Sequence, residues 1–321
     1  MTTTRREFVR QLGVGAAATL LGPRAMRALG HLQLADAMKF GYASITWGGD
    51  DAHAIEDIAA LGFPGIQLRA NVVERYGKDP SVLRDLLARH HLSFVALSSG
   101  NVSIDPAQKT RVIQEHVDHA RFLRDAGGLY LQLIDTRPRG RPIESADYTS
   151  LGRLLTEIGK RTADLGIPAA YHHHAGSLGE KPDEIQRVLD AADPKYVRLL
   201  LDIAHYTVGG GDPAAAVHQY ADRLLFLHIK DVRIPAPDKP PPSFEFVELG
   251  QGQIDLPAVF KALREVQFHG WGIVELDSVP DHARTPRESG SMSKRYLEDV
   301  IGVRISRVMR PGERSEVGSQ V

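Results

Sequence analysis

Beyond residue 38, short β-branched or apolar stretches alternate with longer stretches of helical periodicity. The segment DDAHAIEDIAALG (50–62) shows the helical pattern, with apolar residues at positions 52, 55, 58, 59 and 61. Gly62 and Gly166 each follow a helical stretch and lead into an apolar one, as glycines at helix ends commonly do. Eight strands are predicted, at residues 39–47, 63–70, 93–100, 128–136, 167–174, 197–205, 224–232 and 270–278.

Eight strand–helix units fit a single-domain (β/α)8 TIM barrel, a fold that typically takes about 250 residues. We therefore predict one α/β barrel domain over residues 38–305. An open, doubly wound sheet is the alternative, but that fold usually carries a G-x-G-x-x-G turn after its first strand. The segment ITWGGDDAH (45–53) has two glycines without this spacing, so the barrel is preferred.

The first residues resemble a targeting signal more than a part of the barrel. The segment TTRREFVRQLGVGAAATLLG (3–22) places Arg5 and Arg6 ahead of Phe8 and a weakly apolar stretch. That stretch is shorter than the roughly 20 residues a membrane-spanning helix needs. With the small-residue site ADA at 35–37, it predicts a twin-arginine export signal over residues 1–37 and a periplasmic or exported protein. The alternative is an amphipathic helix with a chance arginine pair.

The C-terminal segment and the overall composition limit the partners. Residues 306–321 are polar and are predicted to form a flexible tail. The chain has 39 Lys and Arg against 40 Asp and Glu, and this balance argues against nucleic acid and against stable membrane association. With no cysteine, any metal must bind to His, Asp or Glu. The sequence leaves the oligomeric state open, a homo-oligomer included.

The segment YHHHAG (171–176) has three consecutive histidines at the end of a predicted strand. Three adjacent imidazoles are unusual in a packed core, because each ring needs partners for two nitrogens. Side chains alternate along a strand, so His172 and His174 are expected to share one face. His173 is expected to point toward the surrounding helices.

Polar residues gather at the carboxyl ends of the predicted strands, where the active sites of TIM barrels lie. They are Trp47, Gln67, Gln132, His172, His174, Asp202, His205, His228, Lys230 and Glu275. An imidazole or carboxylate from each of four successive strands can converge on one point, and two histidines with two carboxylates suit Mn²⁺, Co²⁺, Zn²⁺ or Fe²⁺. The predicted metal ligands are His172, Asp202, His228 and Glu275. Alternatively, Asp202 caps the next turn and Glu275 forms a buried ion pair.

One proline-rich insertion, IPAPDKPPPSFEF (234–246), follows the seventh predicted strand. Such a segment is stiff, and it either forms a wall of the pocket or is an inert surface excursion.

Six segments in order carry a family resemblance: SITWGGDD, YHHHAG, LDIAHY, FLHIKDV, LGQGQID and GWGIVELD. From the first strand to about residue 303, the chain resembles the xylose-isomerase-like barrels of sugar isomerases and epimerases, and within them the inosose dehydratase branch. The resemblance implies Asp202, His228 and Glu275 as metal ligands and His205 as a substrate-binding residue. The usual strand-five glutamate ligand falls at His172, so an imidazole stands where the epimerases have a carboxylate.

This departure favours a divalent-metal-dependent lyase or dehydratase over an ordinary epimerase. The expected reaction is β-elimination from a keto-sugar, an inosose or a 3-keto-glycoside through an enediolate. His174 or Glu275 is the expected base, and Lys230, with a pKa lowered by burial and a metal, is the expected acid or oxyanion partner. The predicted substrate-binding residues are Trp47, Gln67, Gln132 and His205.

The cofactor expected for this site is one divalent ion, Mn²⁺ or Co²⁺ first, with Mg²⁺, Zn²⁺ and Fe²⁺ as alternatives. Two other carbohydrate functions stay open: a sugar isomerase or 3-epimerase on the same metal site, and a non-catalytic exported sugar-binding barrel. The DNA-repair endonucleases of the superfamily are disfavoured by the neutral charge balance.

Overall fold

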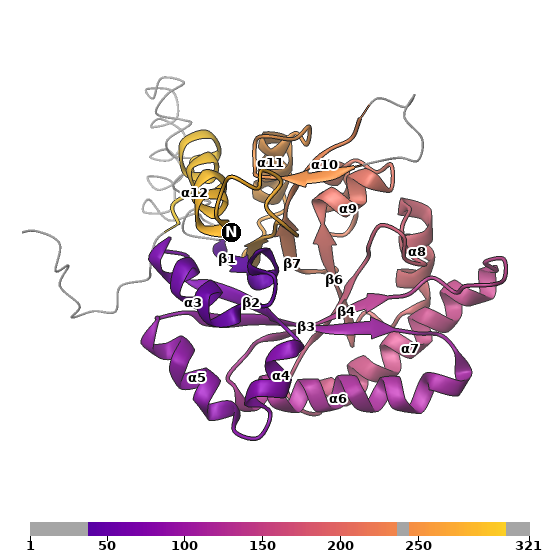
Figure 1. Ribbon diagram of the computed structural model, residues 1–321. Coiled ribbons are helices and arrows are strands. Elements are labelled where there is room, and N and C mark those ends of the chain that lie inside the picture. Colours follow the sequence, from indigo (N-terminus) through magenta and orange to yellow (C-terminus); the bar gives the residue numbers. More distant parts are fainter. Residues whose placement is uncertain (1–37, 236–243, 306–321) are drawn as a thin grey trace, which may run out of the picture.

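The computed structural model describes residues 38–235 and 244–305. Within them, eight parallel strands close into a barrel in the order β1-β10-β7-β6-β5-β4-β3-β2, and helices surround it (Figure 1). The prediction of a (β/α)8 barrel is confirmed. The predicted export signal (1–37) and tail (306–321) lie outside the described residues and stay predictions. No helix in the described part of the chain has the length and apolarity to cross a membrane.

The barrel strands are short and the helices between them vary in length. The strands are β1 (Lys39–Ala43), β2 (Gly65–Arg69), β3 (Ser93–Val102), β4 (Tyr130–Asp135), β5 (Ala169–His172), β6 (Val197–Asp202), β7 (Leu224–Ile229) and β10 (Trp271–Val274). The α-helices are α3 (Asp51–Ala60), α4 (Asn71–Tyr76), α5 (Pro80–Arg89), α6 (Lys109–Asp125), α7 (Ser145–Ala163), α8 (Pro182–Ala191), α9 (Ile203–Val208), α10 (Pro213–Gln219), α11 (Leu256–Glu265) and α12 (Pro286–Tyr296). Short 3₁₀ turns span Ser44–Trp47 and Pro106–Gln108, and a π-helical turn spans Leu297–Ile301.

Seven of the eight predicted strands end earlier than the sequence indicated, and the first and the sixth show the physical reason. The first was predicted through residue 47, but β1 ends at Ala43 and a 3₁₀ turn follows, in which the Thr46 hydroxyl donates to the Leu276 carbonyl at 2.5 Å. The sixth was predicted through residue 205, but β6 ends at Asp202. The Asp202 carboxylate accepts the backbone N–H groups of Ala204 and His205, both at 2.9 Å, and so begins a helix there.

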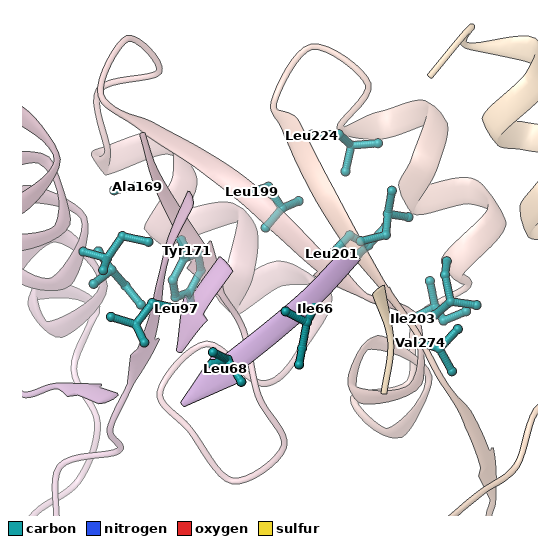
Figure 2. Packing of buried hydrophobic residues seen from close by; sticks show 14 of the residues in the cluster. Ile66, Leu68, Leu97, Ala169, Tyr171, Leu199, Leu201, Ile203, Leu224 and Val274 are labelled. Atoms are coloured by element: carbon teal, nitrogen blue, oxygen red, sulfur yellow. The ribbon is translucent and has the colours of Figure 1, made fainter. Parts of the chain in front are cut away.

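Alternation along the strands separates two apolar layers. Tyr171, Leu199 and Leu201 point outward and pack against the helices (Figure 2). Ala170 and Leu200, on the opposite faces of the same strands, lie in the barrel interior. The same alternation aims the last residues of β5 and β6 into the mouth of the barrel.

Large side chains fill the lower part of the barrel, which requires one small residue opposite them. A Cβ atom on Gly65 would come within 2.5 Å of the Trp271 ring and 2.7 Å of Val95. Any larger residue at position 65 therefore overpacks the interior.

A small antiparallel hairpin follows the barrel strand β7. Its strands are β8 (Asp231–Arg233) and β9 (Glu245–Val247), and Val232 pairs with Phe246. The Asp231 carboxylate accepts the backbone N–H groups of Gly250 and Gly252, both at 3.0 Å, which anchors the hairpin to the LGQGQID turn. Residues 244–246, the end of the proline-rich insertion, are thereby held against the barrel mouth.

Candidate metal centre and active site

The four predicted metal ligands come together at the carboxyl ends of neighbouring strands. His172 ends β5, Asp202 ends β6, His228 lies on β7, and Glu275 directly follows β10. Asp202 and His228 are register partners across β6 and β7. All four side chains are buried, and one donor atom from each lies within 4.8 Å of the others. The parallel register of the strands thus brings together residues that are far apart in the chain.

His228 is held so that one ring nitrogen faces the carboxylates. Its Nδ1 lies 3.3 Å from Asp202 Oδ2 and 3.0 Å from Glu275 Oε2. Its Nε2 lies 3.0 Å from Gln67 Oε1, and the Gln67 amide in turn donates to Gln132 Oε1 at 2.9 Å. Because Gln67 presents an oxygen, the Nε2–H donates to it, and Nδ1 is the atom left for a metal.

The charge of this centre depends on whether His228 carries a proton. Burial alone would lower the pKa of His228, but the carboxylates of Glu275 and Asp202 outweigh it and raise the pKa to about 9. Near neutral pH and without a metal, His228 is therefore a cation. A bound metal has to displace that proton.

His172 contributes a neutral imidazole. Burial, together with His228 and His174, holds its pKa well below the usual value of 6.5. Its Nδ1 is buried and has no hydrogen-bond partner among the described residues. A buried nitrogen without a partner is unfavourable unless a further group, such as a metal or a ligand, binds to it.

The donor set fits a divalent ion by charge as well as by chemistry. Burial would raise the pKa of Glu275, but His228 and Lys230 hold it well below its ordinary value, so this group is a carboxylate. The carboxylates of Asp202, Glu275 and Asp277 surround the one ammonium of Lys230, which leaves two negative charges when His228 is neutral. Two imidazoles and two carboxylates of this kind fit a divalent transition metal.

A second histidine group adjoins the first. His172, His174 and His205 also have donor atoms within 4.8 Å of one another, and the rings of His174 and His205 lie 3.7 Å apart. This group has no carboxylate and so carries no charge for a cation to offset. The mixed set with Asp202 and Glu275 is the better metal centre.

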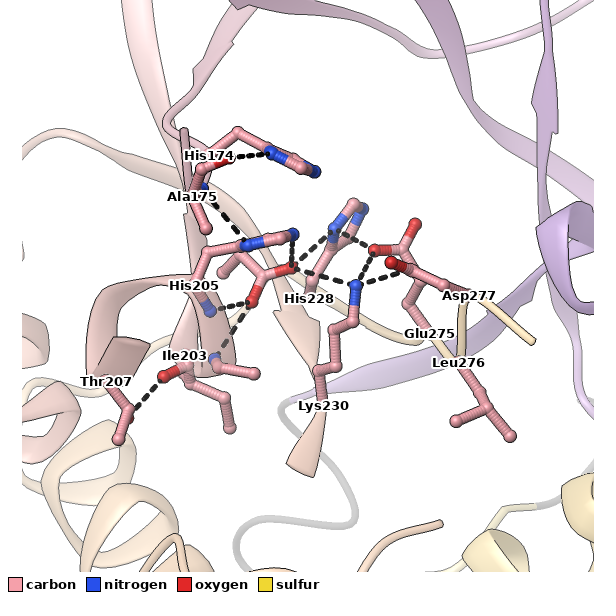
Figure 3. Close-up of polar contacts among 12 residues, drawn as sticks. His174, Ala175, Ile203, His205, Thr207, His228, Lys230, Glu275, Leu276 and Asp277 are labelled. Atoms are coloured by element: carbon pink, nitrogen blue, oxygen red, sulfur yellow. Dashed lines mark hydrogen bonds and ion pairs between the residues drawn. The ribbon is translucent and has the colours of Figure 1, made fainter. Parts of the chain in front are cut away.

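Lys230 lies fully buried between three carboxylates (Figure 3). Its Nζ lies 3.1 Å from Glu275 Oε2, 2.5 Å from Asp277 Oδ1 and 4.0 Å from Asp202 Oδ2. Burial alone would lower the pKa of Lys230, but these carboxylates raise it above its ordinary value. Without a metal, burial does not lower the pKa of Lys230 as expected, and Lys230 is an ammonium rather than a ready proton donor.

Two residues of this site were not identified from the sequence. The ring of Phe246, on β9, lies over Lys230 with 3.8 Å from its centroid to Nζ, and 4.9 Å from the ring of His205. Asp277, two residues after Glu275, binds the same ammonium, and burial raises its pKa. Asp277 stood in the quoted segment GWGIVELD, whereas no local signal placed Phe246 here. The β9 part of the insertion thus contacts the centre through Phe246, although no residue of β9 lines the pocket beside it.

His174 stands at the edge of the centre, just beyond the end of β5. Its Nδ1 donates to the Ala175 carbonyl at 2.8 Å, which leaves Nε2 free to accept a proton. The side chain is half-buried and lines a pocket of about 330 Å³ beside the metal centre. His173 points the other way, as predicted, and its buried ring contacts Tyr206.

The predicted substrate-binding residues divide into two groups. Gln67 and Gln132 line the 330 Å³ pocket. His205 accepts the Ala175 backbone N–H on Nδ1 at 3.2 Å, and its buried Nε2 lies 3.9 Å from Asp202 Oδ2 without a hydrogen-bond partner among the described residues. Trp47 is different, because the 3₁₀ turn directs its indole N–H to Asp57 at 2.9 Å. It lines neither this pocket nor a second, larger cavity of about 910 Å³ that adjoins the pocket, and its position indicates packing instead of substrate contact.

Known proteins with similar sequences share most of the barrel. A family model described as xylose isomerase-like TIM barrel matches residues 55–296. The inosose dehydratase of Lacticaseibacillus casei is 28% identical over 302 residues, covering 83% of this chain and 98% of that protein. The inosose dehydratase of Geobacillus kaustophilus (strain HTA426) is 27% identical over 296 residues, covering 82% and 94%. Both relatives belong to the branch that the sequence motifs indicated.

Solved structures give the same fold. The structure of the IolI protein with a binding zinc atom superposes with a TM-score of 0.70 at 21% identity, covering 82% of this chain and 98% of that one. The probable 3-DHS dehydratase AsbF from Bacillus anthracis superposes with a TM-score of 0.65 at 14% identity, covering 81% and 98%. With the family model matched across most of the barrel, this chain belongs to the xylose isomerase-like TIM-barrel family.

Proposed function

We propose that this protein is a divalent-metal-dependent lyase that performs β-elimination on a keto-sugar, an inosose or a 3-keto-glycoside. The observation that carries the proposal is His172, a buried neutral imidazole in the ligand set where a reversible proton transfer would need a second carboxylate. The inosose dehydratases among the similar proteins support the same reaction class.

His172, Asp202, His228 and Glu275 would hold the metal. A divalent ion bound there would supply Lewis acidity, which stabilises negative charge on a substrate oxygen. The Gln67 amide fixes the tautomer of His228 that offers Nδ1. Mn²⁺ and Co²⁺ remain the first candidates, with Zn²⁺, Fe²⁺ and Mg²⁺ as alternatives.

His174 is the better of the two expected bases. Glu275 is engaged by His228 and Lys230 and has a depressed pKa, so it is a weak base. The free Nε2 of His174 takes the proton from the carbon beside the ketone, and the C–H electron pair forms the enediolate. The C–O bond at the next carbon then breaks with its electrons, and the leaving oxygen takes the proton back from His174 as water or an alcohol.

Lys230 and His205 stabilise and orient the substrate. The buried ammonium of Lys230 is a fixed positive charge beside the developing oxyanion, which is the role its raised pKa suits. Because the Nδ1 of His205 accepts a backbone N–H, its Nε2 carries the hydrogen and can donate to a substrate hydroxyl. Gln67 and Gln132 add polar groups to the pocket wall.

A sugar isomerase or 3-epimerase is the second candidate, and Asp277 favours it. This carboxyl lines the same pocket as His174, and burial raises its pKa. A group of that kind could return a proton to the opposite face of an enediolate.

We further propose that the protein is exported by the twin-arginine route, on the basis of Arg5, Arg6 and the apolar stretch that follows them. Its partner is a small carbohydrate, and the neutral charge balance disfavours nucleic acid.

Turnover of a substrate panel tests the proposal. The metal-loaded protein is incubated with scyllo-inosose, 3-keto-glucosides and ketohexoses, and with the matching sugars that lack the extra ketone. Activity restricted to the keto compounds, lost in His174→Gln and retained in the exposed-site control His218→Gln, supports the lyase. Binding of the same compounds without any turnover would instead identify a sugar-binding barrel.

A further inference from the structure

A large cavity adjoins the pocket at the metal centre. It has a volume of about 910 Å³, and the loops after β3, β4 and β5 form its walls. Asn101, Ile134 and His174 line both this cavity and the 330 Å³ pocket. A ligand that reacts beside His174 can therefore extend directly into the larger space.

The wall of this cavity is rich in arginine. Its four guanidinium groups belong to Arg111, Arg137, Arg139 and Arg141. Two of them are already paired. Arg111 binds Glu115 at 2.9 Å, and Arg141 binds both oxygens of Asp147 at 2.6 and 2.7 Å. These two are parts of ion pairs within the protein.

The other two arginines have no carboxylate partner within residues 38–235 and 244–305. Arg137 makes one hydrogen bond, from Nη1 to the Ser177 carbonyl at 3.1 Å, which holds it at the rim. Arg139 makes no hydrogen bond or ion pair with the part of the chain that the structure describes. Most of their donors are left for a ligand.

The carboxylates of the cavity do not neutralise these arginines. Asp135 accepts the Tyr171 hydroxyl at 2.9 Å and the Leu178 backbone N–H at 2.5 Å, so its two oxygens are engaged in a buried network. Asp105 accepts the Ala107 backbone N–H at 3.0 Å in its own turn. Counted with Glu115 and Asp147, these carboxylates equal the four arginines in number, but neither Asp105 nor Asp135 forms an ion pair with Arg137 or Arg139, whose guanidinium groups stay open to an anion.

We propose that the substrate carries an anionic group, a carboxylate or a phosphate, and that Arg137 and Arg139 bind it while the keto-sugar ring lies at the metal centre. This inference rests on the proposed carbohydrate function of the site. A guanidinium matches both anions with paired hydrogen bonds, whereas neutral sugars gain nothing from two unpaired positive charges. The cavity also has room for an anionic group, because its volume of about 910 Å³ exceeds the 330 Å³ of the adjoining ring pocket.

Binding of unreactive sugar acids tests the inference without relying on catalysis. The affinities of the full chain for D-glucose, D-glucuronate, glucose 6-phosphate and inorganic phosphate are measured by calorimetry at low ionic strength. We expect one of the two charged sugars to bind about 10- to 100-fold more tightly than D-glucose, and added salt to reduce that difference. Tighter glucuronate assigns a carboxylate, and tighter glucose 6-phosphate assigns a phosphate.

Two double variants that remove the same charge distinguish the effect of the cavity arginines on binding from the effect of the protein's net charge. Arg137→Gln with Arg139→Gln should abolish the preference for the anion. The control, Arg89→Gln with Arg153→Gln, removes two exposed arginines outside the cavity and should keep the preference for the anion. Equal affinity for charged and neutral sugars, or an unchanged preference in the cavity variant, would overturn the inference. So would inorganic phosphate binding as tightly as the sugar phosphate.

The binding experiment can fail independently of the turnover panel that tests the proposed function. If neutral 3-keto-glucosides turn over and no anion preference is seen, the lyase stands and the anionic subsite is wrong. If nothing turns over but the preference depends on Arg137 and Arg139, the subsite stands and the lyase is wrong.

Discussion

The Nδ1 atom of His228 lies 3.0 Å from Glu275 Oε2, and both side chains are buried at the mouth of the barrel. The carboxylates of Glu275 and Asp202 both face this nitrogen, and they outweigh burial and raise the pKa of His228, so a positive charge is favoured at this point. In the metal-free protein a proton supplies that charge, and a metal would compete for the same place.

Removing the His228 ring should therefore remove the metal. We expect His228→Ala to retain no stoichiometric metal after dialysis, because one ligand and its contact to Gln67 are lost together. Inductively coupled plasma mass spectrometry measures the metal content, and far-ultraviolet circular dichroism checks the fold. The control His218→Ala removes an exposed histidine and should keep the wild-type metal content. Full occupancy in His228→Ala would refute the assignment.

Phe246 is expected to position Lys230. The Phe246→Leu variant keeps an apolar cover but removes the ring face 3.8 Å from Nζ. A cation–π contact contributes about 0.5–2 kcal/mol, so kcat should fall about 2- to 30-fold while KM stays near the wild-type value. Steady-state kinetics on the reactive keto-sugar measures both constants. The control Phe244→Leu changes a partly exposed ring that contacts Phe246. An equal loss in both variants would mean that the effect is not specific to Lys230.

The buried imidazole of His116 should lower the protein's free energy of unfolding in weak acid relative to neutral pH. Burial, then the neighbouring His119, lowers its pKa from 6.5 to about 4. The unfolded chain therefore binds more protons below pH 6.5, and stability is lost as the pH falls from 6.5 toward 4. At pH 5 the loss is about 2 kcal/mol relative to pH 7. Urea unfolding of wild type and His116→Leu at both pH values isolates this contribution.

The control for that experiment is His218→Leu, which removes an exposed imidazole. If His116→Leu lost as much stability between pH 7 and pH 5 as the wild type does, the prediction would be contradicted. His116 also accepts or donates a hydrogen bond with Ser99 at 2.6 Å, so the variant is expected to be less stable at pH 7. The difference between the two pH values, rather than either value alone, is the test.

Export should depend on the arginine pair. In a bacterium with an active twin-arginine system, the variant Arg5→Lys with Arg6→Lys is expected to accumulate in the cytoplasm, because that system reads the pair. Cell fractionation followed by immunoblotting measures the distribution. Arg10→Lys, which lies outside the pair, is the matched control. Unchanged export of the double variant would show that residues 1–37 are not this signal.

The sequence predicted the barrel and the convergence of His172, Asp202, His228 and Glu275 because both depend on regular strands. Strand alternation with parallel register is enough to bring strand-end side chains to one mouth. The structure departs from these predictions where the chain leaves the strands. The 3₁₀ turn after β1 directs Trp47 to Asp57, which no apolar pattern encodes.

Other features depend on contacts between distant segments. Phe246 reaches Lys230 only because Asp231 anchors the β8–β9 hairpin to a later turn. The pKa of Lys230 is raised because carboxylates from β6 and from the segment after β10 converge on it, whereas the sequence indicated only its burial. Both features require the folded chain.

The most direct test of the central claim is the product formed in deuterated water. The metal-loaded protein is incubated with scyllo-inosose and with a 3-keto-glucoside, and the products are followed by ¹H and ¹³C nuclear magnetic resonance. β-Elimination predicts an unsaturated ketone, or the diketone into which it tautomerises, from the inosose, and a released aglycone from the glycoside. A product that keeps all its oxygens and carries one deuterium at an inverted carbon would mean that the enzyme is an epimerase and would contradict the account.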